Sequence, residues 1–278
     1  IPAQAGIQWH SVDACSSHWT PAFAGVTMNG NKEHLMKLLT ALLLALTLLF
    51  TSNVTAADQT HVLILVTQAD KMTSGKPTGL WLEEYAVPYN LFIAEGFKVT
   101  TVTLNGGKVP IDARSKPNDK QKAEWQEAIK QLQYTRVLNQ VDLKKFDAIV
   151  IPGGHGVMFD LVDAKDATQA IETFNKQQKI IAAICHGPAA LVNAKSPNGA
   201  PLVHNRDVTG FSDSEEAAVK LTDDMPFLLE SKLRELRAKV TTTSNFQPHA
   251  VQSGNLITGQ NPASSHAVAQ LVIKALKR

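Results

Sequence analysis

The segment "KIIAAICHGPAAL" (179–191) decides the fold, because it changes from strand to helix within one turn. Residues 179–184 form a short apolar run, which predicts a strand buried on both faces. Cys185 follows at the turn, and we expect "HGPAALVNA" (186–194) to continue as a helix. Such a junction is typical of a parallel α/β sheet and places its turn residue at the edge of the sheet.

From residue 61 onward, the chain repeats this alternation of short apolar runs and amphipathic stretches. The pattern predicts further strands at 61–66, 97–104, 146–154, 239–244 and 255–260, and helices at 82–96, 119–133, 167–178, 214–221, 225–238 and 264–276. Pro88 would break a helix interior, so we expect it near the start of its helix. Residues 105–142 are polar and predict an excursion from the sheet. Strands that alternate with helices indicate a single α/β domain at 58–278, with a mostly parallel sheet sandwiched between helices.

Composition and charge are those of an ordinary globular protein. The 278 residues are 44% hydrophobic and 19% charged, and the formal net charge is +2. Lysine and arginine are dispersed, without a basic block or interleaved aromatic residues. We therefore expect no nucleic-acid partner.

The N-terminal part has the pattern of a secretory signal peptide at 36–57. Lys37 makes the start positive, 38–50 is an apolar run, and small residues precede a predicted cleavage site near Ala57. The run is shorter than the roughly 20 residues that span a bilayer, and a retained membrane anchor is the alternative. We expect a periplasmic or secreted protein without a stable membrane span. Residues 1–35 have no apolar period and are predicted to be a non-native or mis-called extension.

The chain holds two cysteines, Cys15 and Cys185. Cys15 lies in the extension, so the mature protein would carry one thiol and no internal disulfide. We expect the turn to push the Cys185 side chain into solvent and the following helix N-terminus to lower the pKa of the thiol. A buried core thiol is the alternative. The adjacent His186 favours a reactive thiol, because imidazole suits general acid–base work.

A second polar group follows the strand at 146–154. In "PGGHG" (152–156), the backbone N–H groups of the glycine turn are suited to a developing oxyanion, which makes Gly153, Gly154 and His155 candidate oxyanion or substrate-binding residues. A metal site at His155 is disfavoured, because the other histidines lack ligand spacing.

An acidic pair, Glu83 and Glu84, follows the first strand and its loop. One carboxylate could orient the thiol or accept a proton from substrate, whereas the alternative is an ordinary charge at a helix N-terminus. The carboxyl ends of parallel strands meet at one edge of the sheet. We therefore expect the acidic pair, the glycine turn and Cys185 to lie close together.

The combination of "PGGHG" with "AAICHGPAAL" (182–191) resembles the ThiJ/PfpI superfamily, relatives of the class I glutamine amidotransferase fold. Four longer segments resemble its heat-shock chaperone and glutathione-independent glyoxalase III branch, namely "TGLWLEEYAVPYNLFIAEGFKV" (78–99), "FDAIVIPGGHGVMFDL" (146–161), "MPFLLESKL" (225–233) and "LITGQNPASS" (256–265). The similarity covers 61–276.

This resemblance implies a flavodoxin-like, doubly wound sheet, a site without a cofactor, and a homodimer. It implies catalytic roles for Cys185, His186 and Glu84, and it selects Glu84 over Glu83 by the pattern T-G-(four residues)-E-(three)-P. It also implies an oxyanion site at Gly153–Gly154, together with the N–H of His186. The export signal is a departure, because the branch is best known from the cytoplasm.

Three hypotheses about function follow. The first is a glutathione-independent glyoxalase that converts methylglyoxal, a small dicarbonyl, to lactate through a hemithioacetal on Cys185, with possible deglycase or chaperone activity. The second is a cysteine amidase or peptidase that uses the same residues on an amide substrate. The third is a non-enzymatic chaperone or oxidative-stress sensor of the cell envelope.

Overall fold

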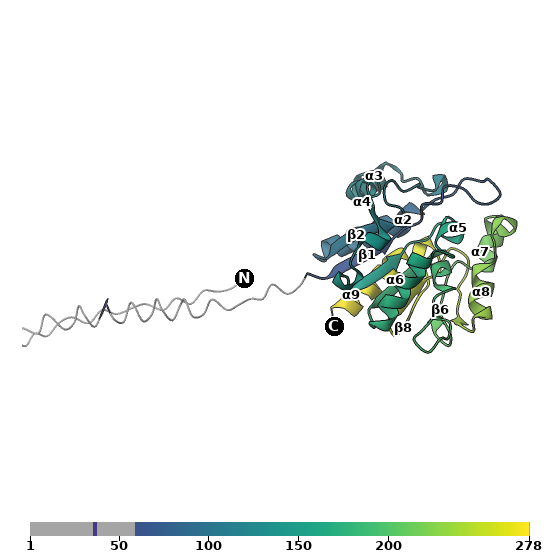
Figure 1. The fold of residues 1–278 in the computed structure, drawn as a ribbon. Coiled ribbons are helices and arrows are strands. Elements are labelled where there is room, and N and C mark those ends of the chain that lie inside the picture. The colour runs from purple at the N-terminus through teal and green to yellow at the C-terminus, as the bar shows by residue number, and fades with distance from the viewer. Residues whose placement is uncertain (1–35, 38–58, 278) are drawn as a thin grey trace, which may run out of the picture. The chain divides into compact units, whose positions relative to one another are not determined.

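The computed structural model of the chain describes residues 36–37 and 59–277 (Figure 1). The predicted extension at 1–35 lies outside these residues, as does the predicted signal peptide apart from Met36 and Lys37. In the described part of the chain, we find no helix of the length and apolarity that a membrane span requires. The segment from residue 59 carries the α/β fold.

Seven strands form one sheet in the order β3-β2-β1-β4-β5-β9-β8, and a separate pair joins β6 to β7. The strands are β1 (His61–Leu65), β2 (Lys98–Thr103), β3 (Arg136–Val137), β4 (Ala148–Ile151), β5 (Ile180–Ile184), β6 (Asp207–Val208), β7 (Lys239–Val240), β8 (Ala250–Ser253) and β9 (Leu256–Gly259). Within the seven-stranded sheet every pairing is parallel except that of β8 with β9. The predicted α/β class with a mostly parallel sheet is confirmed.

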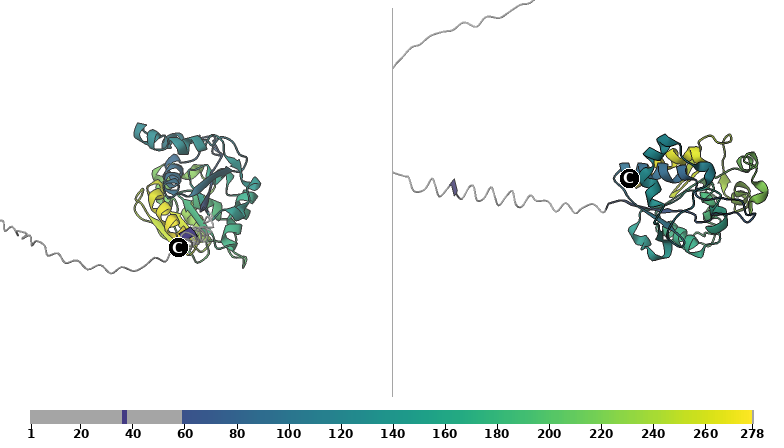
Figure 2. Two further views of the ribbon diagram at one scale, coloured as in Figure 1. Left: turned by 90° about the vertical axis from the view of Figure 1, so that its left-hand side faces the viewer. Right: turned by 90° about the horizontal axis from the view of Figure 1, so that it is seen from above.

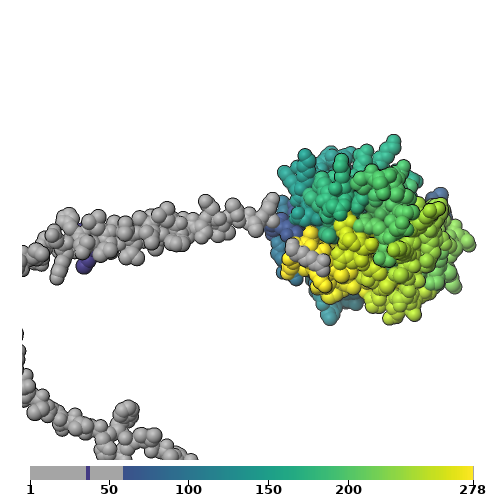
Figure 3. Space-filling model, turned by 90° about the horizontal axis from the view of Figure 1, so that it is seen from below, coloured from purple at the N-terminus to yellow at the C-terminus, as the bar shows by residue number. Residues whose placement is uncertain are grey.

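Helices cover both faces of this sheet. They are α2 (Leu82–Ala94), α3 (Asp119–Glu124), α4 (Gln126–Gln131), α5 (Val157–Asp160), α6 (Lys165–Lys176), α7 (Asp213–Ala218), α8 (Leu229–Glu235) and α9 (Ser265–Leu276), with 3-10 turns η1 (Ala113–Ser115), η2 (Leu138–Gln140), η3 (Leu143–Lys145), η4 (Gly187–Leu191), η5 (Thr222–Asp224) and η6 (Pro262–Ser264). Helices α2 and α9 lie side by side on one face, and α6 packs against β4 and β5 on the other (Figures 1 and 2). In Figure 3, the yellow C-terminal residues form a continuous surface with the yellow-green residues that precede them.

The central strand β1 shows why its sequence is apolar throughout. Val62 and Ile64 pack into the core beneath α2 and α9, whereas Leu63 and Leu65 point into the core beneath α6. All four side chains are fully buried. Successive residues of a strand point to opposite faces, so a sheet covered on both sides requires an unbroken apolar run.

Two helix predictions are wrong in detail. Pro88 lies inside α2 rather than near its start. Proline removes one intrahelical hydrogen bond, but Pro88 is buried and α2 is held by its packing against α9 and β2, which outweighs that loss. The segment after Cys185 forms the 3-10 turn η4 instead of an α-helix. Here Gly187 approaches β4 so closely that a Cβ would lie 2.1 Å from the carbonyl oxygen of Ile151.

The strand predictions also need correction in three places. Only Lys239–Val240 of the predicted strand at 239–244 is a strand, because the N–H of Thr243 donates to the side-chain Oε1 of Gln260 (2.8 Å) in place of a strand partner. The polar segment 105–142 does leave the sheet, but it returns as the edge strand β3. Strand β8 was not predicted, since its residues are only partly buried.

The strand order places a switch point at β1, which has β2 on one side and β4 on the other. Connections diverge there, and such a point leaves a crevice at the carboxyl ends of the strands. Asp160 of α5, which follows β4, connects this segment to the loop after β1. Its carboxylate accepts hydrogen bonds from the N–H of Gln68 (2.6 Å) and the hydroxyl of Thr67 (2.8 Å).

Candidate active site

Cys185 occupies a strained turn at the carboxyl end of β5. Its φ angle is +60°, a left-handed conformation that is uncommon outside glycine. The N–H of Cys185 donates to the Gly259 carbonyl (2.9 Å), and its own carbonyl accepts from the N–H of Phe211 (2.8 Å). These two bonds fix the backbone on both sides of the strained residue. The sharp turn predicted at this position is therefore present.

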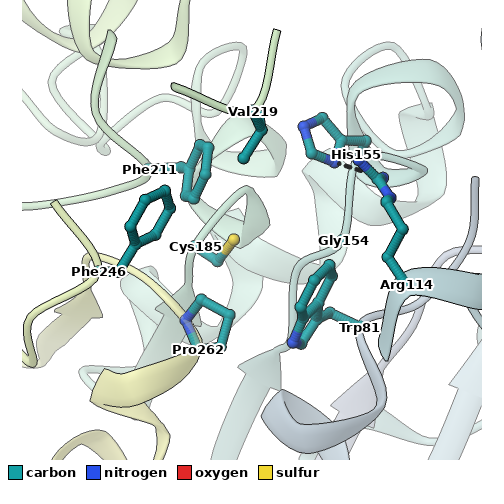
Figure 4. A pocket seen from close by; sticks show the side chains of 9 residues that line it. All are labelled: Trp81, Arg114, Gly154, His155, Cys185, Phe211, Val219, Phe246 and Pro262. Carbon is teal, nitrogen blue, oxygen red and sulfur yellow. Dashed lines mark hydrogen bonds between the residues drawn. The ribbon is translucent and has the colours of Figure 1, made fainter. Parts of the chain in front are cut away.

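The thiol lies at the bottom of a cavity instead of pointing into solvent as predicted. Cys185 is only 3% exposed, and the cavity above it has a volume of about 170 Å³. Apart from Cys185 and Gly154, its lining is mostly aromatic and apolar, with two polar side chains on one side, and consists of Trp81, Arg114, His155, Phe211, Val219, Phe246 and Pro262 (Figure 4). Burial occurs because the flanking small residues let the turn pack deeply against β4.

Glu84, in the first turn of α2, is fully buried beside the thiol. Its Oε2 accepts a hydrogen bond from the N–H of Gly153 (2.7 Å). Its Oε1 has no oxygen or nitrogen partner in the described part of the chain and is left with the Cys185 thiol as its polar neighbour. Glu83 is only partly buried on the same helix. The structure thus places Glu84, and not Glu83, at the site.

The two glycines of the turn after β4 have different roles. The N–H of Gly153 is already engaged by Glu84, so Gly153 positions the acid rather than acting as the predicted oxyanion donor. The backbone N–H groups of Gly154 and His186 lie beside the thiol, where each acts to lower the pKa of Cys185. Gly154 has a φ of +92°, and a Cβ there would lie 2.2 Å from the carbonyl oxygen of Gly79. Only glycine fits this approach.

A buried carboxylate that sequence reasoning missed completes the site. Glu216 of α7 bridges two histidines, with Oε2 2.8 Å from Nε2 of His186 and Oε1 2.9 Å from Nε2 of His155. Nδ1 of His186 lies 3.4 Å from Sγ of Cys185. Cys185, His186 and Glu216 therefore form a cysteine–histidine–acid triad. His155, predicted to contact substrate, lines the cavity and also holds Glu216.

The charges of this triad follow from burial and hydrogen bonding. Burial, reinforced by the neighbouring His155, lowers the pKa of His186 to about 4. Burial alone would raise the pKa of Glu216, but hydrogen bonds from the two histidines lower it to about 2. At neutral pH, an ionised Glu216 thus accepts from the Nε2–H of a neutral His186. The free lone pair on Nδ1 of His186 then faces the thiol, as a general base requires.

Cys185 and Glu84 form an electrostatically coupled pair. Burial raises the pKa of the Cys185 thiol, and the Glu84 carboxylate adds to this effect. Burial likewise raises the pKa of Glu84 well above its usual range. The prediction that a helix N-terminus lowers the pKa of this thiol is wrong. Burial raises the pKa, and the segment after the cysteine is the five-residue 3-10 turn η4 instead of an α-helix. Because ionisation of each group makes ionisation of the other less favourable, the pair disfavours double ionisation.

His155, His186 and Glu216 are also the residue types that bind metals, and their ligand atoms lie within 4.8 Å of one another. However, both Nε2 atoms are engaged with the carboxylate at hydrogen-bond distances. The guanidinium of Arg114 lies 3.1 Å from Nδ1 of His155, where its fixed positive charge opposes a cation. This arrangement suits proton transfer better than metal binding.

Comparisons with known proteins agree with this geometry. The model of the DJ-1/PfpI family matches residues 78–275, which include all three triad residues. The chain belongs to the DJ-1/PfpI family. The resemblance noted from the sequence motifs is confirmed, and the flavodoxin-like sheet is the fold of this family.

Individual members of the family are similar over most of the domain. A glutathione-independent glyoxalase of Schizosaccharomyces pombe is 28% identical over 221 residues, which are 73% of this chain and 90% of the relative. The structure of a 24 kDa rapid encystment protein of Francisella tularensis is 34% identical, with a TM-score of 0.74 and coverage of 78% and 99% of the two chains. The structure of glyoxalase III from Candida albicans is 26% identical, with a TM-score of 0.70 and coverage of 78% and 97%.

Proposed function

We propose that this member of the DJ-1/PfpI family is a glutathione-independent glyoxalase that converts methylglyoxal and water to lactate. The observation that carries the proposal is the placement of Cys185 between two proton-transfer groups, Glu84 and His186. Relatives named glutathione-independent glyoxalases support an enzyme that acts on small dicarbonyl compounds. A nucleophile flanked by two such groups is what an internal proton shift between adjacent carbons requires.

The first step in this proposal is addition of the thiol to the aldehyde. Sγ of Cys185 forms a bond to the aldehyde carbon, and Nδ1 of His186 takes the thiol proton at 3.4 Å. Protonated Glu84 gives its proton to the aldehyde oxygen, so that a neutral hemithioacetal results. The N–H groups of Gly154 and His186, which lie beside the thiol, stabilise the negative charge that develops on the aldehyde oxygen as the carbon–sulfur bond forms.

The second step moves a proton from one carbon to the next. The Glu84 carboxylate removes the hydrogen from the carbon attached to sulfur, which produces an enediolate, and the hydroxyl proton of the former hemithioacetal passes to the neighbouring oxygen. Protonated His186 then delivers its proton to the neighbouring carbon, and a lactoyl thioester of Cys185 forms. Glu84 and His186 thereby return to their starting states. Water, activated by His186, cleaves the thioester to lactate and the free thiol.

Hydrolysis of an amide is the second candidate, because Cys185, His186 and Glu216 also have the arrangement of a cysteine hydrolase triad. The buried Glu84 beside the sulfur favours the glyoxalase instead. Amide hydrolysis needs no second acid on the far side of the nucleophile, whereas the carbon-to-carbon proton shift does.

Product analysis distinguishes these functions. The full chain is incubated with methylglyoxal in buffer without glutathione, and lactate is measured by proton NMR alongside release of a chromogenic amide reporter. We expect lactate to form in proportion to enzyme and the reporter to remain intact. Reporter cleavage without lactate would establish the hydrolase. Neither product, together with suppression of aggregation of an unfolded client, would favour the chaperone.

We also propose that the protein acts outside the cytoplasm, as the sequence pattern at 36–57 predicts. N-terminal sequencing of the protein from fractionated cells tests this. A start near Ala57 or Asp58 in the exported fraction supports export. An intact peptide containing Trp9 or Trp19 would overturn it.

A further inference from the structure

The hydrogen-bonded network does not end at the triad. Arg114 donates from Nη2 to Nδ1 of His155 (3.1 Å), and His155 contacts Glu216 (2.9 Å), which contacts His186 (2.8 Å). Figure 4 shows the Arg114–His155 bond at one side of the cavity. Arg114 is itself fixed by Asp112, which accepts from Nε at 2.9 Å and from Nη2 at 2.6 Å. Five side chains thus lead from Asp112 to the base that faces Cys185.

The donors and acceptors in this network leave one consistent arrangement of protons. A guanidinium can only donate hydrogen bonds, so Nδ1 of His155 must accept. A neutral imidazole that accepts at Nδ1 carries its hydrogen on Nε2. The Nε2–H of His155 therefore donates to Oε1 of Glu216. Glu216 then needs only one more donor, and the Nε2–H of His186 donates to Oε2.

We propose that His155 is a positioning residue that sets the tautomer of His186 through Glu216. His155 holds one oxygen of the buried carboxylate, so the other oxygen stays aimed at Nε2 of His186. Without this bond, Oε1 would be buried and unpaired, and Glu216 would rotate or take up a proton. His186 could then carry its hydrogen on Nδ1, where it would block acceptance of the thiol proton.

Two substitutions separate this role from simple packing. His155→Leu keeps an apolar side chain in place but removes both hydrogen bonds. His155→Gln offers an amide N–H toward Glu216 and an oxygen toward Arg114. The control is His266→Leu, because His266 is exposed on α9. Thermal unfolding of all variants confirms that each is folded under the assay conditions.

The main readout is the rate at which iodoacetamide alkylates Cys185, followed by mass spectrometry of its peptide so that Cys15 does not interfere. We expect His155→Leu to slow alkylation about 10- to 100-fold, a loss of the size that follows removal of an outer hydrogen-bond partner from a metal-binding histidine. His155→Gln should recover most of the rate, and His266→Leu should match the wild type. An unchanged rate in His155→Leu, or a His155→Gln rate as low as that of His155→Leu, would overturn the proposal.

Turnover of methylglyoxal gives a second readout that rests on the proposed function. His155→Leu should lower kcat by the same factor and change KM less than twofold, because the role acts on the base and not on substrate binding. A loss confined to KM would assign His155 to substrate contact instead. Alkylation requires no substrate, so it tests His155 even if the proposed glyoxalase reaction fails.

The mouth of the cavity carries an independent inference about substrate. Phe246 is 46% exposed and has a φ of +61°, an uncommon conformation for an aromatic residue. Its N–H donates to Oε1 of Glu215 (2.7 Å), and the same oxygen accepts from the side chain of Asn261 (2.8 Å). Glu215 is fully buried. The buried carboxylate of Glu215 therefore fixes the backbone of Phe246 at the mouth of the cavity.

Phe246, Phe211 and Trp81 surround the approach to Cys185 with aromatic rings (Figure 4). A methyl group would contact little of this wall, whereas an aromatic ring could stack on it. We infer, resting on the proposed function, that the preferred substrates are 2-oxoaldehydes with an aryl or similarly bulky apolar group. Phe246 is then a specificity-determining residue.

Initial rates with phenylglyoxal and methylglyoxal test this selectivity in the wild type, Phe246→Ala and the control Tyr134→Ala, since Tyr134 is 88% exposed and does not line the cavity. We expect the ratio of kcat/KM to favour phenylglyoxal in the wild type and to fall about tenfold in Phe246→Ala alone. A wild-type preference for methylglyoxal, or an unchanged ratio in Phe246→Ala, would overturn the inference. Turnover of neither aldehyde would contradict the glyoxalase proposal instead.

Discussion

Oε2 of Glu216 lies 2.8 Å from Nε2 of His186, where it completes a triad with Cys185. Nothing about this contact is local, because α7 brings Glu216 to the turn from 30 residues further along the chain. The contact fixes His186 as a neutral base whose Nδ1 faces the thiol.

Glu216→Gln should lower kcat/KM for methylglyoxal about 10²- to 10⁴-fold, since the amide replaces one of the two carboxylate oxygens by an NH2 group, which cannot accept from a histidine N–H. Glu235→Gln is the control, because Glu235 is an exposed acid on the next helix. Steady-state kinetics on both variants measure the effect. Similar kinetics for the two variants would remove Glu216 from the site.

The acidic pair on α2 offers a matched comparison. Glu84→Gln should reduce kcat about 10²- to 10⁴-fold, because it removes the group that exchanges protons with the hemithioacetal. Glu83→Gln should stay within about twofold of the wild type, since Glu83 is only partly buried and does not contact Gly153. Lactate formation at saturating methylglyoxal measures kcat. Equal losses at the two positions would contradict the assignment of Glu84.

Acid should inactivate and destabilise the protein through His186. The pKa of His186 is about 4 in the folded protein and 6.5 in the unfolded chain, so the unfolded chain binds more protons between these values. The free energy of unfolding should therefore lose about 3 kcal/mol from this residue as pH falls from 6.5 to 4. Glu84 acts in the opposite direction, because its pKa is raised and its protonation favours the folded state.

The contribution of His186 is isolated by comparing wild type with His186→Asn in urea unfolding at several pH values. The difference between their free energies of unfolding should shrink or reverse as pH falls toward 4. The acid limb of kcat/KM for the wild type should lie near pH 4, where His186 takes up a proton. A constant difference in stability, or an acid limb near pH 6.5, would show that His186 is not buried in its neutral form.

Gly187→Ala should destabilise the fold, because a Cβ would lie 2.1 Å from the carbonyl oxygen of Ile151. Backbone must move to relieve this contact, at a cost of about 1–3 kcal/mol. Gly210→Ala is the milder control, since its nearest contact is a flexible Leu229 side chain at 3.2 Å. The difference in thermal midpoint between the two variants measures the effect. If Gly187→Ala is as stable as Gly210→Ala, the close packing of the turn on β4 is wrong.

Much of the fold could be predicted from the sequence because β1, β4 and β5 are buried on both faces. Double burial leaves an unbroken apolar run in the sequence, and each such run ends at the edge where the site lies. The edge strand β8 and the short pair β6–β7 leave weaker signals, because their residues are only partly buried or the strands are two residues long.

The site was less predictable, and Glu216 shows why. Glu215 and Glu216 follow Ser212, a pattern typical of a helix N-terminus, and Ser212 with Glu215 does form a capping box there. The sequence pattern cannot distinguish an acid that caps a helix from its neighbour that faces two histidines. That distinction depends on how α7 packs against the turns after β4 and β5.

The most direct test of the central claim is the rate of lactate formation by Cys185→Ala relative to wild type, in full-length protein without glutathione. Both proteins should show the same thermal midpoint within a few degrees. The structure places Sγ at the floor of the cavity between Glu84 and His186, so removal of the sulfur should abolish the enzymatic rate. Lactate formation by Cys185→Ala at the wild-type rate would contradict the account.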